Sequence, residues 1–312
     1  MRDPSPLDAA VADAVTPPPR PFTGVMWMLL SGVLFVGITA IVKHVGQTLP
    51  PAQTVFMRYC FGLFFLVPQI PAMARAGLSP PMLWNFGLRG VAHTIGVLFW
   101  FTAMARIPMG EVTAMGYLQP VYITLGAALF LHERIAARRI AALGFAILGA
   151  LIVLRPGFRE LSSGHIAMLA CSPFFAASYL LAKKMTDLTS PAATLGWMSV
   201  TVTIFLAPFA WAVWEPVSWA EMGWTLAMAG IATLGHYSML RAFRAAPIAM
   251  TQPVTFLQLV WSVALGALLY GEAVDFWVVL GGTVILASVV FIAWREARLK
   301  RSRAGVPPQP GG

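Results

Sequence analysis

The sequence has little charge, few cysteines and no clustered histidines. Only 11% of its 312 residues are charged, whereas about a quarter are charged in a typical soluble domain. The two cysteines, Cys60 and Cys171, lie in separate apolar runs and lack the paired spacing typical of zinc sites. No two of the five histidines lie three or four residues apart. These absences exclude a soluble enzyme, and we expect neither a metal nor a cofactor.

Apolar runs take the place of the missing charge. Hydrophobic residues make up 58% of the chain, which is more than one core can bury, so most of the chain must face lipid. A helix needs about 20 mostly apolar residues to cross a bilayer. Breaks at proline, glycine and charge clusters predict such helices, joined by connections too short to form a soluble domain. The ten predicted transmembrane helices cover residues 22–43, 52–73, 82–105, 109–131, 136–155, 164–184, 192–214, 219–242, 248–270 and 275–295.

The positive charges predict the orientation of these helices. With both termini in the cytoplasm, 15 of the 21 Lys and Arg residues fall on the cytoplasmic side, 4 fall outside and 2 lie within spans. This is the positive-inside bias of a multi-pass protein, here of the cytoplasmic (inner) membrane. It also accounts for the net charge of +9, so we expect contact with membrane lipid and not with nucleic acid. We expect a disordered cytoplasmic tail at 1–21 and a basic cytoplasmic tail at 297–312.

The chain contains an internal duplication. Two 17-residue segments, 117–133 and 256–272, match without a gap at six positions, including a glutamine at the third position and a glutamate at the last. A shift of 140 residues also aligns 24–43 with 164–183. Each copy holds five predicted helices, an odd number, so the second copy must be inverted relative to the first. The predicted fold is therefore an all-α integral membrane protein with two inverted five-helix repeats, residues 22–156 and 157–296.

Inverted repeats of this kind are typical of alternating-access carriers, which hold the substrate near the midplane between the two halves. The stretch ARIPMGEVTAMGYLQPVYITLGAALFLHERIAARRIAALGFAILGALIVLRPG at 105–157 resembles the EamA domain of the drug/metabolite transporter superfamily. The stretch at 244–286 resembles it more loosely, with Ala273 in the place of Arg134. The resemblance implies a ten-helix transporter. Members of the superfamily carry amino acids, vitamins such as riboflavin, nucleotide-like metabolites and drugs.

We therefore expect a secondary carrier for a small organic metabolite. The chain has no Gly-Lys ATP-binding loop, so transport would draw on a gradient, an exchange or a partner. Two alternatives belong to other classes. An intramembrane lipid-modifying enzyme would need a clustered acidic metal site or a Ser/His/Asp set, and the chain has only five Asp residues, in the N-terminal tail and in loops. A structural membrane protein is the third reading. The substrate, the direction of transport, the coupling ion and the choice between monomer and homodimer stay open.

Polar and aromatic side chains within spans are the candidates for substrate contact, because a polar group in hydrocarbon is costly unless it is paired. The two repeated glutamines lie about ten residues into their helices, near the midplane, beside prolines that favour kinks. Two arginines lie six to seven residues into their spans, and a guanidinium matches a carboxylate or phosphate. Aromatic rings offer stacking surfaces. Each group also has a structural alternative to substrate contact: interhelical hydrogen bonds for the glutamines, snorkelling to the membrane surface for the arginines, and placement at the lipid interface for the aromatic residues. The predicted substrate-binding residues are Gln119, Gln258, Arg89, Arg58, Tyr117, Trp100, Tyr179 and Trp261.

A second set of residues is predicted to couple or gate transport. His93 and His236 lie in the third and eighth spans, and histidine changes charge near neutral pH. Glu111 is the one carboxylate candidate for a proton relay, although it lies near the outer end of its helix. Lys43 and Lys183 are symmetry-related and end the first and sixth helices. Each of these residues also has an ordinary structural reading, in helix packing or interfacial anchoring. The Glu133–Arg134 pair is expected to fix a helix end.

Overall fold

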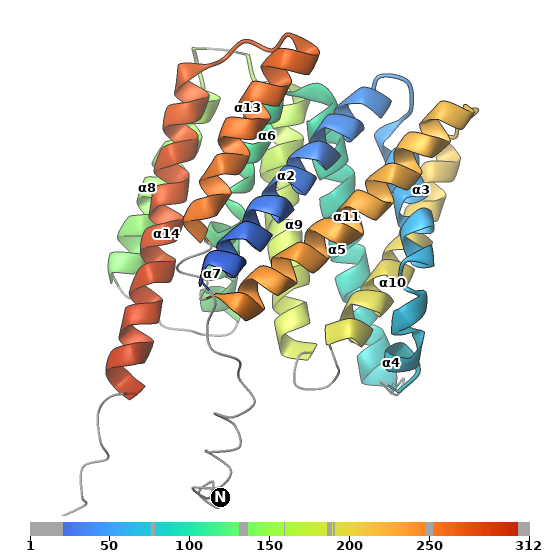
Figure 1. Ribbon diagram of the computed structural model, residues 1–312, viewed down its shortest axis with the longest axis horizontal. Helices are drawn as coiled ribbons and strands as arrows, with labels where there is room; N and C mark the ends of the chain where they lie inside the picture. The colour runs from blue at the N-terminus through green and yellow to red at the C-terminus, as the bar shows by residue number, and fades with distance from the viewer. Residues whose placement is uncertain are drawn as a thin grey trace, which may run out of the picture.

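The computed structural model is a bundle of α-helices (Figure 1), and it describes residues 21–75, 79–130, 137–158, 160–185, 189, 191–246 and 252–304. Glu133, Arg134, residues 1–20 and residues 305–312 lie outside the described residues, as does the side chain of Lys183. The elements are α2 (Pro21–Val45), α3 (Pro51–Phe64), η1 (Val67–Gln69), α4 (Ile70–Arg75), α5 (Pro80–Arg106), α6 (Met109–Gly116), α7 (Gln119–Phe130), α8 (Ala137–Leu154), α9 (Ser163–Met185), α10 (Pro191–Ala212), α11 (Trp219–Ala245), η2 (Gln252–Thr255), α13 (Phe256–Tyr270) and α14 (Phe276–Ala304).

Each of the ten predicted spans coincides with helical structure, which confirms the predicted fold class. Seven spans are single helices, whereas the second, fourth and ninth are each divided into shorter pieces. Within the described ranges, four helices are long and apolar enough to cross a membrane, by length and composition alone: Phe22–Val45, Pro80–Arg106, Ser163–Ala182 and Ala193–Ala212. Shorter apolar helices cover Ile140–Leu154, Leu257–Tyr270 and Phe276–Phe291. Helix α14 continues beyond the last predicted span to Ala304, into the predicted basic tail.

The helix ends follow from local sequence. Pro51 and Pro80 begin α3 and α5, where the missing amide hydrogen costs nothing because the first N–H groups of a helix lack intrahelical partners. Ser218 and Glu221 form a reciprocal capping box at the start of α11. Gly271 ends α13 in the left-handed conformation, with φ 64°, and the amides of Gly271 and Glu272 bond back to Ala267 and Gly266.

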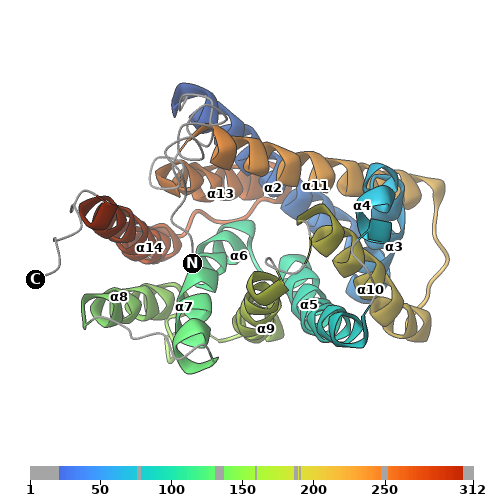
Figure 2. The ribbon, with the colours of Figure 1, turned by 90° about the horizontal axis from the view of Figure 1, so that it is seen from below.

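The helix contacts reveal the duplication directly. Helix α5 of the first repeat packs against α9, the first helix of the second repeat, and α11 packs in the same way against α2. The fifth helices of the two repeats, α8 and α14, pack against each other (Figure 2). Such reciprocal pairing is what a twofold relation between repeats requires. Helix α2 rises from the lower end of the bundle in Figure 1, whereas α9 descends from the upper end, so the two repeats are inverted.

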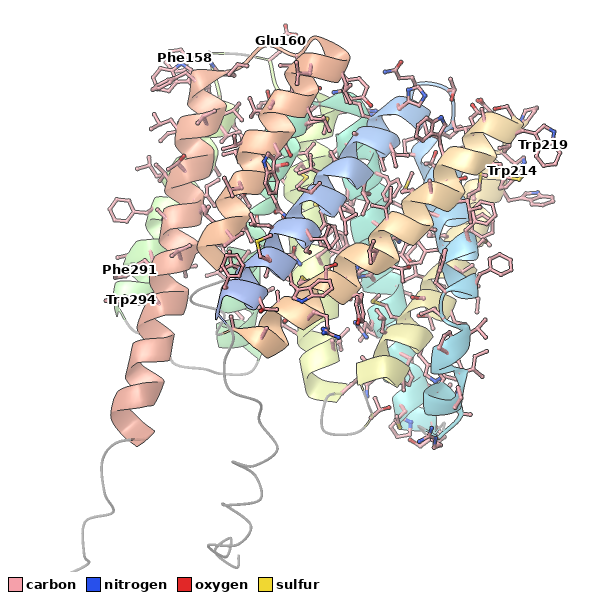
Figure 3. All side chains as sticks on the ribbon, viewed as in Figure 1. Phe158, Glu160, Trp214, Trp219, Phe291 and Trp294 are labelled. Atoms are coloured by element: carbon pink, nitrogen blue, oxygen red, sulfur yellow. The ribbon has the colours of Figure 1, made fainter. Side chains whose placement is uncertain are left out.

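We call the end of the bundle that carries Phe158, Glu160, Trp214 and Trp219 the upper end (Figure 3). Phe291 and Trp294, on α14, point away from the bundle in the same view. Large exposed apolar side chains of this kind suit a surface covered by lipid, with Trp enriched where lipid meets water. Helices α8 and α14 approach closely through Gly149 and Gly281, since a Cβ atom on Gly281 would lie 2.5 Å from the carbonyl oxygen of Gly149.

Candidate functional site

Each repeated segment begins at a break between two helical elements, and the two breaks touch. The fourth predicted span divides into α6 and α7 at Tyr117 and Leu118, while η2 gives way to α13 at Thr255. Pro120 explains the first break, because it lacks an amide hydrogen and its ring crowds the carbonyl four residues earlier. The Tyr117 hydroxyl donates a 2.7 Å hydrogen bond to the carbonyl of Thr255. Discontinuous helices that meet between inverted repeats are the usual setting of a carrier's substrate site.

The two predicted glutamines lie beside these breaks. Gln119 is the first residue of α7 and Gln258 is the third residue of α13, and both side chains are half-buried. Gly32 of α2 leaves room for the second glutamine, because a Cβ atom there would lie 3.1 Å from both Gln258 Cγ and Trp261 Cζ3. The structure therefore places Gln258 and Trp261 together against α2. The hydroxyls of Thr113 and Ser262, 2.7 Å apart, join α6 to α13 in the same seam.

A second group of polar residues surrounds His93, the midpoint of the 27-residue helix α5. Its Nε2 lies 3.0 Å from the Tyr59 hydroxyl of α3, and its Nδ1 lies 3.3 Å from the Ser178 hydroxyl of α9. Phe175 packs against the imidazole with ring centroids 5.2 Å apart, and Trp100 packs edge-on against Phe175. Tyr59 and Ser178 were not predicted from the sequence, because a Tyr or Ser inside an apolar helix is common.

Two arginines complete this group, which we call the central cluster: Arg58, Tyr59, Arg89, His93 and Ser178. The Arg58 guanidinium lies over the Tyr59 ring, 4.4 Å from its centroid. The side chain of Arg89 is buried, and one guanidinium nitrogen donates a 2.8 Å hydrogen bond to the carbonyl of Thr194. Its Nε is also buried and has no hydrogen-bond partner in the part of the chain that the structure describes. Among the ion pairs of the described residues, none includes Arg58 or Arg89. Arg89 lies four residues before His93 on α5, so the two side chains lie on the same face of that helix.

This arrangement concentrates positive charge in the membrane without an acidic partner in the described part of the chain. A buried cation in a bilayer is expensive, and such groups usually face a substrate pathway or a water-filled cavity. The cluster therefore suits a ligand that brings hydrogen-bond acceptors or negative charge. No group of three or more His, Cys, Asp or Glu residues in the described part of the chain is able to hold a metal ion.

The remaining predicted residues have varied positions. His236 on α11 lies edge-on to Phe35 of α2 at 5.1 Å and has Nδ1 2.7 Å from the carbonyl of Ala232. Trp100, Tyr117 and Trp261 are half-buried, whereas Tyr179 is 59% exposed. The structure thus groups Arg58, Arg89, His93 and Trp100 around one site and Gln258, Trp261 and Tyr117 around the neighbouring seam.

Polar contacts between the two repeats gather at the upper end. Lys43, the predicted gating lysine of α2, forms an ion pair with Glu272 and donates 3.0 Å to the carbonyl of Ile107. The other oxygen of Glu272 accepts a 2.9 Å hydrogen bond from the amide of Met109, the first residue of α6. Three further contacts join the repeats at this end, between Arg155 and Asp275, Arg106 and Ser163, and Glu111 and His165. We call all of these contacts the upper-end ties.

Known proteins with similar sequences are membrane transporters. The sequence model of the EamA-like transporter family matches residues 22–155 and 162–294. A riboflavin transporter of Rhizobium johnstonii is 30% identical over 293 residues, which cover 92% of this chain and 96% of that protein. The pseudopaline exporter CntI of Pseudomonas aeruginosa is 25% identical over 275 residues, covering 87% and 96%. One solved crystal structure superposes with a TM-score of 0.56 at 16% identity, covering 88% of this chain and 98% of that one.

Proposed function

This chain belongs to the EamA-like transporter family, and from that premise we propose that it is a secondary carrier for riboflavin or a closely related flavin. The transporter class follows from the family. The choice of a flavin is supported by the relative from Rhizobium johnstonii, a riboflavin transporter, and by the chemistry of the central cluster. We further propose that the protein works by alternating access in the inner membrane of a bacterium, with both termini in the cytoplasm.

The observation that carries the proposal is Arg89, a buried guanidinium whose Nε has no hydrogen-bond partner among the described residues. The flat ring system of a flavin has carbonyl and nitrogen acceptors along one edge. A guanidinium presents donors in a fixed planar fork that matches such an edge. The second cation of the cluster, Arg58, stacks on Tyr59 and adds a further set of donors.

The aromatic residues around the cluster suit the faces of the same ligand. Phe175 and Trp100 lie beside His93, and aromatic rings stack on planar heterocycles. The sugar-alcohol chain of riboflavin carries hydroxyl groups, which both donate and accept hydrogen bonds. Amide side chains also do both, so we assign Gln119 and Gln258 to that chain. A cationic metabolite would be disfavoured, because two arginines in a low-dielectric site repel it.

The duplicated architecture supplies the conformational change. The central cluster joins α3 and α5 of the first repeat to α9 of the second, so a ligand there contacts both halves. The broken helices that meet through Tyr117 and Thr255 provide hinges, since helix interruptions absorb changes in backbone angles. Rocking of one repeat against the other around a fixed site would expose it to each side in turn.

Uptake into proteoliposomes tests the proposal. Purified protein is reconstituted, and internalised ligand is measured for riboflavin, its phosphate ester, S-adenosylmethionine and a set of amino acids, with protein-free liposomes as the background. We expect saturable uptake of riboflavin that unlabelled riboflavin blocks and that amino acids leave unchanged. Preference for the phosphate ester would mean that the cargo is an anionic flavin and not a neutral one. Saturable uptake of another class that riboflavin does not compete with would overturn the proposal.

A further inference from the structure

The corner between α5 and α6, residues Arg106–Gly110, lies at the upper end of the bundle, where the two repeats meet. Helix α5 ends at Arg106 because Pro108 disfavours the helical conformation in the residue before it, and Ile107 is accordingly extended, with φ −119° and ψ 162°. The chain then enters α6, whose first residue is Met109. The corner thus presents two backbone groups that lie outside the hydrogen-bond ladders of both helices, the carbonyl of Ile107 and the amide of Met109.

One ion pair satisfies both of these backbone groups. Lys43, near the end of α2, donates 3.0 Å to the carbonyl of Ile107, and Glu272, just beyond α13, accepts a 2.9 Å hydrogen bond from the amide of Met109. The two charged side chains also bind each other. Helix α6 has Pro108 at its N-cap, which provides no side-chain hydrogen bond. The second repeat therefore caps a helix of the first repeat, with a carboxylate that also suits the positive end of the helix dipole.

The backbone around Glu272 fixes its carboxylate in this position. Gly271 ends α13 in the left-handed conformation, with φ 64°, and the amide of Glu272 bonds back to the carbonyl of Gly266 at 3.1 Å. The hydroxyl of Tyr270 donates 2.6 Å to the carbonyl of Ala40 on α2. The end of α13 is therefore a well-defined part of the second repeat, and it meets the first repeat through the Glu272 carboxylate and the Tyr270 hydroxyl.

The corner is also closely packed against the second repeat. A Cβ atom on Gly164, the second residue of α9, would lie 2.7 Å from Ile107 Cγ2 and 2.9 Å from Arg106 Cβ. At the last residue of the corner, a Cβ atom on Gly110 would lie 2.7 Å from Cγ2 of Val263 on α13. These distances are shorter than ordinary van der Waals separations of carbon atoms. The contacts of the corner with α9 and α13 therefore leave no room for one added carbon atom.

We propose that the α5–α6 corner is the gate of the upper end and that the Lys43–Glu272 ion pair holds it closed; the inference rests on the transport function proposed above. Alternating access requires the two repeats to separate at one end when they close at the other. At the upper end Glu272 would leave with the second repeat, while Lys43 and the corner stay with the first. Opening then breaks the charge-assisted hydrogen bond to the amide of Met109 as well as the ion pair. In the proposed orientation this gate faces the outside of the cell.

Two cross-links test whether the repeats separate at the corner. In a background without the native cysteines, Arg106→Cys with Gly164→Cys joins the corner to the second repeat. Gly46→Cys with Ala105→Cys is the matched control, because a Cβ atom on Gly46 would also lie 2.9 Å from the Ala105 Cβ, although both residues belong to the first repeat. A disulfide joins Cβ atoms about 3.8 Å apart, so both pairs require the same small shift.

Riboflavin uptake is compared between the oxidised and reduced forms of each double variant. We expect the disulfide between the repeats to abolish uptake, a reductant to restore it, and the disulfide within the first repeat to leave uptake unchanged. Uptake by the reduced forms shows that the substitutions allow folding. Unchanged uptake through the Arg106→Cys/Gly164→Cys disulfide would overturn the proposal. Failure of this disulfide to form, when the control disulfide does form, would contradict the closed contact at the corner.

Thiol labelling covers the case in which riboflavin is not the cargo. The Met109 side chain is fully buried among side chains of α2 and α13, so Met109→Cys, in the same background, reacts with a water-soluble reagent when the upper end opens. Glu272→Gln keeps an acceptor for the Met109 amide but removes the charge. We expect it to accelerate this labelling by about fivefold or more, because a hydrogen-bonded ion pair is lost from the closed state.

A Cys at an exposed position of the same end is the control for labelling. Gln47→Cys should react at the same rate with and without Glu272→Gln. Equal rates for Met109→Cys with and without Glu272→Gln would overturn the proposal. Faster labelling of Met109→Cys, together with failure of riboflavin uptake by the wild type, would reject the cargo and keep the gate.

Discussion

The Tyr117 hydroxyl and the Thr255 carbonyl are 2.7 Å apart, and each belongs to the break of one of two symmetry-related helices. The hydrogen bond therefore connects the fourth helix of one repeat to the corresponding helix of the other at the point where both are interrupted. It holds together the seam that contains Gln258 and Trp261.

Removal of this hydroxyl should loosen the seam. We expect Tyr117→Phe to lower the free energy of unfolding by ~1 kcal/mol, the usual net value of such a hydrogen bond, and to reduce flux. Thermal unfolding in detergent and proteoliposome uptake measure the two effects. Tyr179→Phe, at a 59% exposed position, is the matched control. Equal behaviour of the two variants would show that the contact between the breaks has no role.

The Lys43–Glu272 ion pair should act as a coupled unit at the upper end of the bundle. Both side chains are largely buried, with exposures of 15% and 12%, so loss of one partner leaves the other charge poorly solvated. We expect Lys43→Met and Glu272→Gln to be non-additive, with a coupling energy of about 1 kcal/mol or more in a double-mutant cycle of thermal stability. Additive effects would mean that the two charges act separately. Arg241→Met, on an exposed residue, supplies the control.

The contact between α8 and α14 should tolerate no added carbon atom. A Cβ atom at Gly281 would lie 2.5 Å from a backbone oxygen, whereas one at Gly144, on the same helix pair, meets nothing within 4 Å. We expect Gly281→Ala to destabilise the protein by about 2 kcal/mol through overpacking. Gly144→Ala should be neutral or stabilising, because alanine favours helices. The comparison uses melting temperatures in one detergent, and similar melting temperatures would contradict the packing described for α8 and α14.

The proposed orientation places the upper end outside the cell. Phe158 is 92% exposed at that end, so Phe158→Cys, in a background with Cys60 and Cys171 replaced, should react with a membrane-impermeant thiol reagent added to intact cells. Ala304→Cys, at the lower end of α14, should react only after the cells are opened. The reverse pattern of labelling would overturn the orientation.

The helical architecture of the chain was largely predictable from the sequence. Apolar runs of membrane-spanning length and the repeated Gln and Glu positions predicted the spans and the inverted repeats, because both depend on local composition and spacing. The prolines near Gln119 and Gln258 predicted kinks, and the structure has a change of helical element near each of them. Membership of the family was likewise indicated by the 105–157 stretch.

The partners of the polar residues were not predictable in the same way. Lys43 and Glu272 were each noticed, but their pairing depends on a contact between the two repeats, and the two residues lie more than 200 positions apart in the sequence. His165 was missed because a single histidine at the start of a helix has no distinctive spacing. Tyr179 was proposed for the cavity from its aromatic character, yet its ring is more exposed than those of Tyr117 and Trp100, since helix rotation is set by packing.

Direct flavin binding to purified protein tests the central claim, that the central cluster around Arg89 binds the transported substrate. Riboflavin fluorescence is quenched when its ring stacks on aromatic side chains, so titration in detergent yields a dissociation constant. We predict saturable quenching by the wild type, affinity weaker by about tenfold or more for Arg89→Gln because hydrogen bonds to a charged group are lost, and unchanged affinity for the exposed Arg75→Gln. Absence of saturable quenching, or equal affinity of Arg89→Gln and wild type, would contradict the claim.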